Sequence, residues 1–294
     1  MSSDAKTGPR QRPSLAVVIG SGGIKTFGGV ALLQFLEAEG IVPDLLIGCS
    51  GGAFMAALWA TGHKPAQMPD LIPELLKPEF FSKLDYGVLW GIPGLPVKRF
   101  GLNHALLRPD HMHATHTRLF GEARLEDLQP KTMLQVTDFQ TGEGFVLEEG
   151  RLADAVYASG AAYPILPMFH WKERWLMDGA YSSPCPVLEA VKRQIDVILA
   201  LTFETTFSDI APGLLPLFQR TQFLCTSTLM RNQMATAIRL HHHELFHLNL
   251  SFDRPIEMWD FEAIPEILAT GQRVVAAKKP EILAALRGVA RGED

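Results

Sequence analysis

The apolar positions near the start of the chain form a short unbroken run that ends in glycines. Leu15 to Ile19 is wholly apolar, and Gly20-Ser21-Gly22-Gly23 follows it. An apolar run bounded by turn residues is typical of a strand buried on both faces, as in a parallel sheet. Apolar residues between Val30 and Glu37 then recur at helical spacing, and Gly40 is a stop signal. The pattern predicts a strand, a glycine turn and a helix.

The same unit repeats at once. We expect a second strand over Asp44 to Ile47, a turn over Gly48 to Gly52, and a helix over Ala53 to Thr61 capped by Gly62. Alternating strands and helices predict an α/β fold, with a mostly parallel central sheet flanked by helices in three layers. Ligand sites in such folds lie at the carboxyl ends of the strands. Further strands are expected at Met133–Thr137, Gly144–Leu147, Trp175–Met177 and Asp196–Thr202, and helices at Ala153–Ser159 and Val187–Lys192.

The remaining segments have weaker patterns. Pro78 to Leu107 is rich in aromatic residues, glycine and proline without clear periodicity, which is compatible with a lid over an apolar pocket or with an irregular connection. Leu214 to His243 is expected to form a long amphipathic helical pair, followed by a strand over Leu248 to Phe252. Phe261 to Arg287 is expected to be a helical segment broken near Gly271 or Pro280.

Composition narrows the class of protein. The 294 residues are 47% hydrophobic and 20% charged, as in a globular protein. The net charge of −5 lacks the basic footprint of a nucleic-acid binder. We expect residues 1–13 to be a disordered lead-in and residues 14–294 to form one catalytic domain. Within that domain, residues 14–202 would be the core and 203–294 a mostly helical completion.

Cysteine usage and hydropathy bear on location. Cys49, Cys185 and Cys225 show no paired spacing, so free thiols in a reducing compartment are expected. The start of the chain is polar and lacks the apolar centre of a secretory signal. Leu45 to His63 is uncharged, but its glycines favour a strand, turn and helix over a membrane span. We therefore expect a cytoplasmic protein, with peripheral membrane contact left open and oligomeric state undetermined.

The second glycine turn contains a candidate nucleophile. Its five residues match G-x-S-x-G between a predicted strand and a predicted helix, the context that this motif requires: Gly48, Cys49, Ser50, Gly51, Gly52. Glycines at the flanking positions allow close packing around a sharp elbow. Ser50 would lie at a helix N-terminus, which favours a developing negative charge. Cys49 occupies the variable position, and we expect its side chain to be buried and to point away from the site.

The first glycine turn is a candidate oxyanion hole. Its successive residues offer main-chain N–H groups without obstructing side chains: Gly20, Ser21, Gly22, Gly23, Ile24, Lys25. Lys25 adds a positive charge. The spacing matches neither the phosphate-binding loop nor the dinucleotide fingerprint, although a plain strand-to-helix turn remains an alternative.

A third glycine-containing turn offers a carboxylate. Asp178, Gly179 and Ala180 follow the predicted strand at Trp175 to Met177, so Asp178 would stand at another strand end. Burial and a hydrogen bond to a serine hydroxyl could make such a carboxylate an effective base.

Together, the three turns resemble the patatin-like phospholipase family, and the likeness extends from about Leu15 to Thr202. The resemblance implies a lipid acyl hydrolase with no metal or organic cofactor. In that family the first loop supplies the oxyanion hole, G-x-S-x-G the nucleophile, and D-G-A the catalytic Asp, here Ser50 and Asp178. Two further segments share the likeness: Thr137-Asp138 with Thr141-Gly142, and Ala158 to Pro164.

The chain also departs from the family pattern. Ser21 replaces a common glycine, Thr26 follows the basic residue where glycine is frequent, and Ser183 replaces an asparagine before Pro184. Thr26 could limit how closely the loop approaches the oxyanion.

Three alternatives stay open. His243-Glu244-Leu245-Phe246-His247 matches the zinc motif H-E-x-x-H, although the adjacent predicted strand argues against the required helix. The histidines between His241 and His247 could instead complete a Ser-His-Asp triad. A non-catalytic lipid-binding or partner-binding module is the third alternative. The dyad is favoured because both other glycine motifs match the family that uses it.

Overall fold

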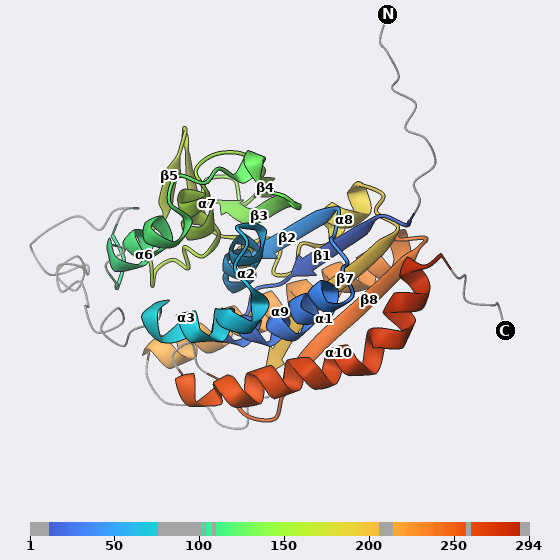
Figure 1. The fold of residues 1–294 in the computed structure, drawn as a ribbon. Helices are drawn as coiled ribbons and strands as arrows, with labels where there is room; N and C mark the ends of the chain where they lie inside the picture. Colours follow the sequence, from blue (N-terminus) through green and yellow to red (C-terminus); the bar gives the residue numbers. More distant parts are fainter. Residues whose placement is uncertain are drawn as a thin grey trace, which may run out of the picture.

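A single eight-stranded sheet lies at the centre of the computed structural model (Figure 1). The structure describes residues 12–75, 102, 104–107, 110–205, 214–256 and 260–288. The strands are β1 (Leu15–Ile19), β2 (Leu45–Cys49), β3 (Lys131–Asp138), β4 (Gly144–Leu147), β5 (Phe169–Trp171), β6 (Arg174–Asp178), β7 (Val197–Thr205) and β8 (Glu244–Phe252). Their order is β5-β6-β3-β2-β1-β7-β8, and β4 also pairs with β3.

The sheet is mostly parallel, as the sequence predicts. β1 lies between β2 and β7, and β3 and β8 extend the sheet on either side, all in parallel. The pairs of β4 and β6 with β3, and of β5 with β6, are antiparallel. Every residue of β1 is buried because helices cover both faces.

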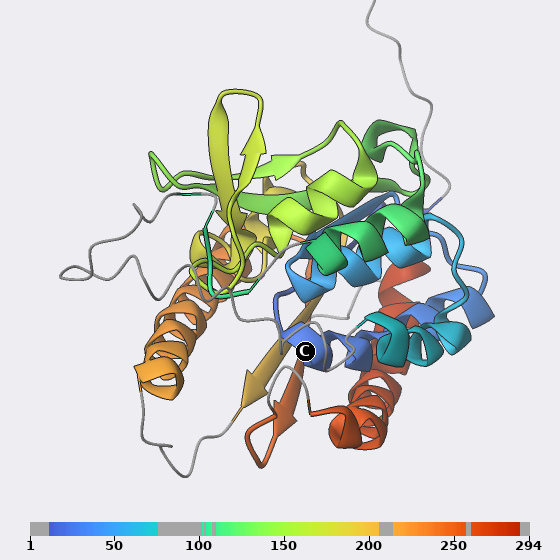
Figure 2. The same ribbon diagram turned by 90° about the vertical axis from the view of Figure 1, so that its left-hand side faces the viewer.

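Helices form a layer on each side of the sheet. They are α1 (Val30–Ala38), α2 (Gly51–Ala60), α3 (Met68–Leu75), α6 (Asp110–Phe120), α7 (Leu152–Ser159), α8 (Val187–Lys192), α9 (Leu214–Leu240) and α10 (Ile264–Leu286). Figure 2 shows α9 on one side of the sheet and α1 and α10 on the other. The three-layer α/β arrangement is therefore confirmed.

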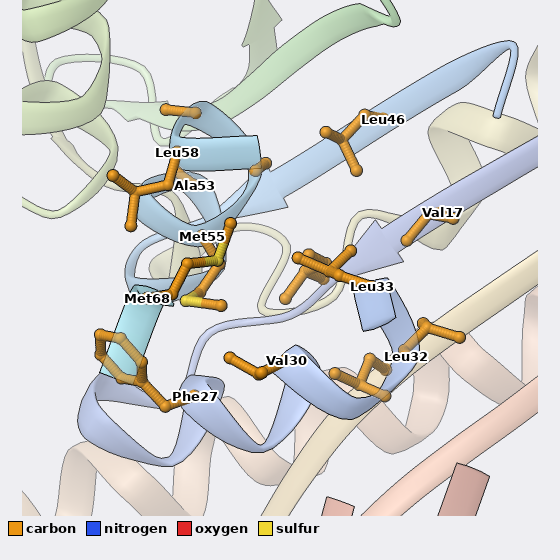
Figure 3. Close-up of a cluster of buried hydrophobic side chains, with 14 of the residues drawn as sticks. Val17, Phe27, Val30, Leu32, Leu33, Leu46, Ala53, Met55, Leu58 and Met68 are labelled. Atoms are coloured by element: carbon orange, nitrogen blue, oxygen red, sulfur yellow. The ribbon is translucent and has the colours of Figure 1, made fainter. Parts of the chain in front are cut away.

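Alternate side chains of β1 belong to two separate hydrophobic clusters. Leu15, Val17 and Ile19 belong to the larger cluster with α1, α2 and α10, whereas Ala16 and Val18 belong to the cluster with α8 and α9. Figure 3 shows the larger cluster where α1 and α2 meet β1 and β2. Its Leu33 and Leu46 are fully buried, and each such side chain stabilises the fold by roughly 1.5–3 kcal/mol.

The predictions for the two long C-terminal helices are wrong in detail. α9 is one helix of 27 residues rather than a helical pair, since neither glycine nor proline interrupts it after Pro216 in its first turn. α10 continues through both Gly271 and Pro280 without a break. Gly271 is retained inside the helix because its α carbon packs against Gly28; an added Cβ would lie 2.0 Å from the Gly28 carbonyl oxygen.

Other boundaries also differ from the predictions. The first glycine turn leads into a 3₁₀ helix, η1 (Gly23–Gly29), before α1 begins. β8 starts at Glu244, four residues earlier than expected, because it pairs with the whole length of β7. Most of the lid candidate, Pro78 to Leu107, lies outside the described residues, as do residues 1–11 of the lead-in.

Candidate active site

The strand pairing of β3 brings two distant turns together. β2 pairs with β3 up to Cys49 opposite Gln135, and β6 pairs with β3 from Asp178 opposite Val136. β4 pairs with Val136 as well, so β4 and β6 lie on opposite sides of β3. β6 therefore approaches β3 on the side of β2, where β2 ends. The turns after Cys49 and after Asp178 meet at this point.

Ser50 lies at the sharp turn between β2 and α2. Its backbone has φ 55° and ψ −121°, a conformation that side-chain-bearing residues rarely adopt and that is common at functional sites. The neighbouring glycines leave room for the turn. A Cβ on Gly48 would lie 2.5 Å from the Ala53 α carbon, and one on Gly52 would lie 2.2 Å from the Ile19 carbonyl oxygen.

The buried hydroxyl group of Ser159 anchors the turn at Ser50 through hydrogen bonds. The Ser50 N–H donates to Ser159 Oγ at 3.0 Å, and Ser159 Oγ donates to the Gln135 carbonyl oxygen at 2.7 Å. Ser159 is fully buried at the end of α7. Its only sequence signal was the Ala158 to Pro164 likeness, which pointed to no role. Ser159 links the strained elbow to the central strand β3.

Asp178 lies within hydrogen-bond distance of the candidate nucleophile. Ser50 Oγ donates to Asp178 Oδ2 at 2.7 Å, and the Ala180 N–H donates to Oδ1 at 2.8 Å. Asp178 is buried, and burial raises its pKa to about 6 although both hydrogen bonds act to lower it. A carboxylate with a pKa near 6 is still ionised at neutral pH and accepts a proton more readily than an exposed one.

Gly179 lets the Asp178 turn pack tightly. A Cβ at this position would lie 2.3 Å from the Gln135 carbonyl oxygen, so the turn runs directly over β3. Thr137 Oγ1 also donates to the Asp178 carbonyl oxygen at 2.9 Å. The D-G-A sequence thus provides the carboxylate, the close approach and the amide that orients the carboxylate.

The amides of the first glycine turn divide into two groups. The Gly20 N–H donates to the Leu201 carbonyl oxygen and the Ser21 N–H to that of Pro184, so both are engaged. The first bond of η1 runs from the Lys25 N–H to the Gly22 carbonyl oxygen. The N–H groups that precede it, including Gly23 and Ile24, have no acceptor within the helix. Gly23 and Ile24 line the same pocket as Ser50.

The Lys25 side chain is buried. Burial lowers its pKa to about 8, and Nζ lies 5.4 Å from the ring centroid of Phe223 on α9, within cation–π range. Cys49 is fully buried, and its pKa is raised well above the usual value by burial and by the Asp178 charge. The thiol therefore stays protonated, which agrees with its expected structural role.

An apolar cavity of about 140 Å³ adjoins the two candidate catalytic side chains. Apolar side chains from α2, α6 and α7, and from the segments before α6 and after α7, dominate its wall: Phe54, Leu107, Met112, Val156, Ile165 and Leu166. His116 also lines it, and burial lowers the His116 pKa to about 3, so this imidazole is neutral. An acyl chain fits the chemistry of this wall.

The H-E-x-x-H sequence does not form a helical face. Glu244 to Phe252 is β8, and His243 immediately precedes that strand. Residues four apart along a strand are separated by about 13 Å, too far to bind one zinc ion. Within the described ranges, His, Cys, Asp and Glu side chains form no group of three that could hold a metal.

The same topology separates these histidines from Ser50. Glu244 pairs with Val197, the first residue of β7, so β8 begins at the amino end of the parallel sheet. Ser50 follows the carboxyl end of β2. His247 Nε2 instead lies 2.7 Å from Thr202 Oγ1. The histidines between His241 and His247 are therefore not placed to complete a triad with Ser50 and Asp178.

Acyl transfer requires a serine at a strand-to-helix elbow, a carboxylate in contact with it, and main-chain amides such as those of the glycine loop, which have no acceptor within their helix. The family comparison agrees with this class of site. The family model described as patatin-like phospholipase matches residues 17–191. The chain belongs to the patatin-like phospholipase family.

Its curated relatives are much longer proteins. Lysophospholipase NTE1 of Candida glabrata is 26% identical over 64% of this chain and 10% of its own length. Lysophospholipase NTE1 of Debaryomyces hansenii is 23% identical over 77% of this chain and 14% of its own length. The chain thus spans between a tenth and a seventh of these relatives.

Among solved structures, VipD from Legionella pneumophila is similar to this chain. The match covers 91% of this chain and 67% of the VipD chain, with a TM-score of 0.42 and 10% identity.

Among the helices within the described ranges, none combines the length and the hydropathy of a membrane-spanning segment.

Proposed function

We propose that this protein is a serine lipid acyl hydrolase, a phospholipase A or a related carboxylic ester hydrolase, that works through a Ser50–Asp178 dyad. The observation that carries the proposal is the 2.7 Å hydrogen bond from Ser50 Oγ to the buried Asp178 carboxylate. Membership of the patatin-like phospholipase family supports the substrate class. The apolar cavity beside both residues supports an acyl chain as the bound group.

The first half of the reaction forms an acyl-enzyme. Ser50 Oγ attacks the ester carbonyl carbon while its proton passes to Asp178 Oδ2. Main-chain N–H groups of the glycine loop, at Gly22, Gly23 and Ile24, stabilise the oxyanion that forms. The oxyanion then collapses, the ester C–O bond breaks, and the leaving alcohol takes the proton from Asp178.

The second half releases the acid. Water attacks the acyl-enzyme carbonyl carbon, and Asp178 accepts a proton from that water. Collapse of the second oxyanion breaks the bond to Ser50 Oγ, which recovers the proton from Asp178. The cycle balances without a metal or an organic cofactor.

We also propose peripheral contact with a lipid surface. Four of the large apolar side chains that are exposed in the described residues belong to α9: Leu217, Leu224, Ile238 and Leu240. α9 carries no acidic residue along its length, which suits the approach to an anionic bilayer.

Labelling with a fluorophosphonate probe followed by mass spectrometry tests the dyad. We expect the label on Ser50, and loss of both labelling and ester hydrolysis in Ser50→Ala. Ser251→Ala, an exposed serine on β8, is the matched control and keeps both. A chelator should leave hydrolysis unchanged. Labelling at another residue, or full activity of Ser50→Ala, would contradict the dyad. A folded wild type that neither labels nor hydrolyses esters would favour the binding module.

A further inference from the structure

Thr26 lies at the junction of the glycine loop and the nucleophile elbow. Its side chain is 1% exposed and lines the cavity beside Ser50. Thr26 Oγ1 donates to the Gly23 carbonyl oxygen at 2.7 Å, across one turn of η1. The hydroxyl therefore fixes the peptide that joins Gly23 to Ile24.

The same side chain contacts the residue after the nucleophile. A Cβ added to Gly51 would lie 2.7 Å from the Gly23 carbonyl oxygen, 2.9 Å from Thr26 Oγ1 and 3.0 Å from Thr26 Cγ2. The Gly51 α carbon is thus packed against the hydrogen-bonded pair that Thr26 and Gly23 form. One threonine connects the loop that precedes α1 to the start of α2.

The loop needs such a restraint because glycine leaves its backbone free. Gly23 has φ 56°, and Gly22 precedes it without a side chain. A trans peptide is planar, so holding the Gly23 carbonyl also sets the direction of the Ile24 N–H. Oxyanion stabilisation depends on donors that are in place before the reaction begins. Without the Thr26 hydroxyl, the Gly23 carbonyl would lose this side-chain donor, and the loop would be held less firmly.

We propose that Thr26 is a positioning residue, whose hydroxyl holds the glycine loop in one geometry relative to Ser50 and Gly51. The inference rests on the proposed function, because it assigns the loop amides to the oxyanion. The positioning is done by the hydroxyl, while the methyl group fills space against Gly51.

Two substitutions separate these roles. Thr26→Val keeps the shape of the side chain and removes the hydroxyl, whereas Thr26→Ser keeps the hydroxyl and removes the methyl group. We expect Thr26→Val to lower kcat roughly 10-fold or more with KM within about twofold, since the loss falls on the transition state. Thr26→Ser should keep kcat within about threefold of the wild type. Wild-type kcat in Thr26→Val, or equal losses in both variants, would overturn the proposal.

Hydrogen exchange gives a readout that does not require activity. In Thr26→Val, the amides of residues 20–26 should exchange faster than in the wild type, while those of Val30–Ala38 stay the same. Thermal unfolding of each variant establishes that it is folded under the conditions of exchange. Unchanged exchange at residues 20–26 would overturn the positioning role, even if esters are hydrolysed. Faster exchange in a chain that hydrolyses no ester would reject the proposed function and retain the role of Thr26 in the loop.

Discussion

At the scale of single residues, Asp178 is both buried and ionised at neutral pH, and this combination lowers the stability of the folded protein. Its carboxylate is buried, and burial disfavours the charged form, so its pKa rises to about 6. The raised pKa suits a base that must accept and return a proton. Above pH 6, however, the folded protein contains a charged carboxylate that is removed from water. The unfolded chain leaves this carboxylate hydrated, so the free energy of desolvation falls on the folded state alone.

Replacing this carboxylate with a neutral isostere should therefore stabilise the fold. Between the usual aspartate pKa of 3.8 and the raised value of about 6, the folded state binds more protons at Asp178 than the unfolded state, so stability falls as the pH rises through this range. Asp178→Asn removes this effect and should raise the free energy of unfolding at pH 8 by about 3 kcal/mol. The gain should shrink as the pH falls through 6 towards 4. Urea unfolding at pH 8, 6 and 4 measures it.

Asp127→Asn is the matched control, because this carboxylate is exposed in the short 3₁₀ helix Leu125–Asp127. A variant at position 178 that is no more stable than the wild type at pH 8 would contradict the assigned cost of burial. An equal gain in the free energy of unfolding at pH 8, 6 and 4 would also contradict that cost.

At the scale of elements, the β2–elbow–α2 unit is the part of the site that local sequence describes best. The apolar run, the glycines and the apolar helix predicted the turn that the structure has, because all three signals come from neighbouring residues. The equivalent first turn was predicted less well. η1 was missed because its seven residues contain three glycines, which read as a loop, although β7 and α10 pack against them.

The tight approach of α2 to β1 gives a prediction for Gly52. A Cβ there would lie 2.2 Å from the Ile19 carbonyl oxygen, so backbone atoms must shift to accept it. We expect Gly52→Ala to cost on the order of 3 kcal/mol or more in the free energy of unfolding. Chemical denaturation followed by circular dichroism measures the loss.

Gly160→Ala is the control for that substitution. Gly160 also lies at a helix end, but the nearest atom to its added Cβ is the Val156 carbonyl oxygen at 3.7 Å, an ordinary contact. Its stability should stay within about 1 kcal/mol of the wild type. Similar losses in the two variants would show that the close approach at Gly52 does not set the cost.

At the scale of the whole molecule, the C-terminal helix α10 supports the site from outside. Gly271 places α10 directly on the Gly28 carbonyl of η1, and Lys279 pairs with Glu39 beyond the end of α1. The buried side chains of α10 belong to the same core as β1 and α2: Ile267, Val275 and Ile282. These contacts support the proposal that residues 14–294 are one domain rather than a catalytic core with an independent appendage.

Gly271→Ala tests this arrangement. The added methyl group would lie 2.0 Å from the Gly28 carbonyl oxygen and would push α10 away from η1. We expect a loss of about 2–4 kcal/mol in the free energy of unfolding, together with a single transition seen by far-ultraviolet and fluorescence probes. Gln272→Ala, at an exposed position of α10, should leave stability within about 0.5 kcal/mol of the wild type. Two separate transitions would contradict a single cooperative domain.

The sequence alone determined which chemical groups are available and the local turns that carry them. Ser50 between glycines, the glycine loop after β1 and the carboxylate before Gly179 are all properties of neighbouring residues, so periodicity and turn chemistry could predict them. Local patterns also predicted the α/β class, because strand and helix periods depend on spacing along the chain.

Only the tertiary structure decided which of these groups meet. Ser50 and Asp178 are 128 residues apart, and their contact exists because β2 and β6 end against the same side of β3. Strand order likewise placed β8 and its histidines away from Ser50, which supports the proposal of Asp178 as the base. The positions of Thr26 and Ser159 depended on packing between elements. Strand pairing and packing bring together residues that are far apart in the chain. The pattern of residues along one sequence does not specify which of these distant residues come into contact.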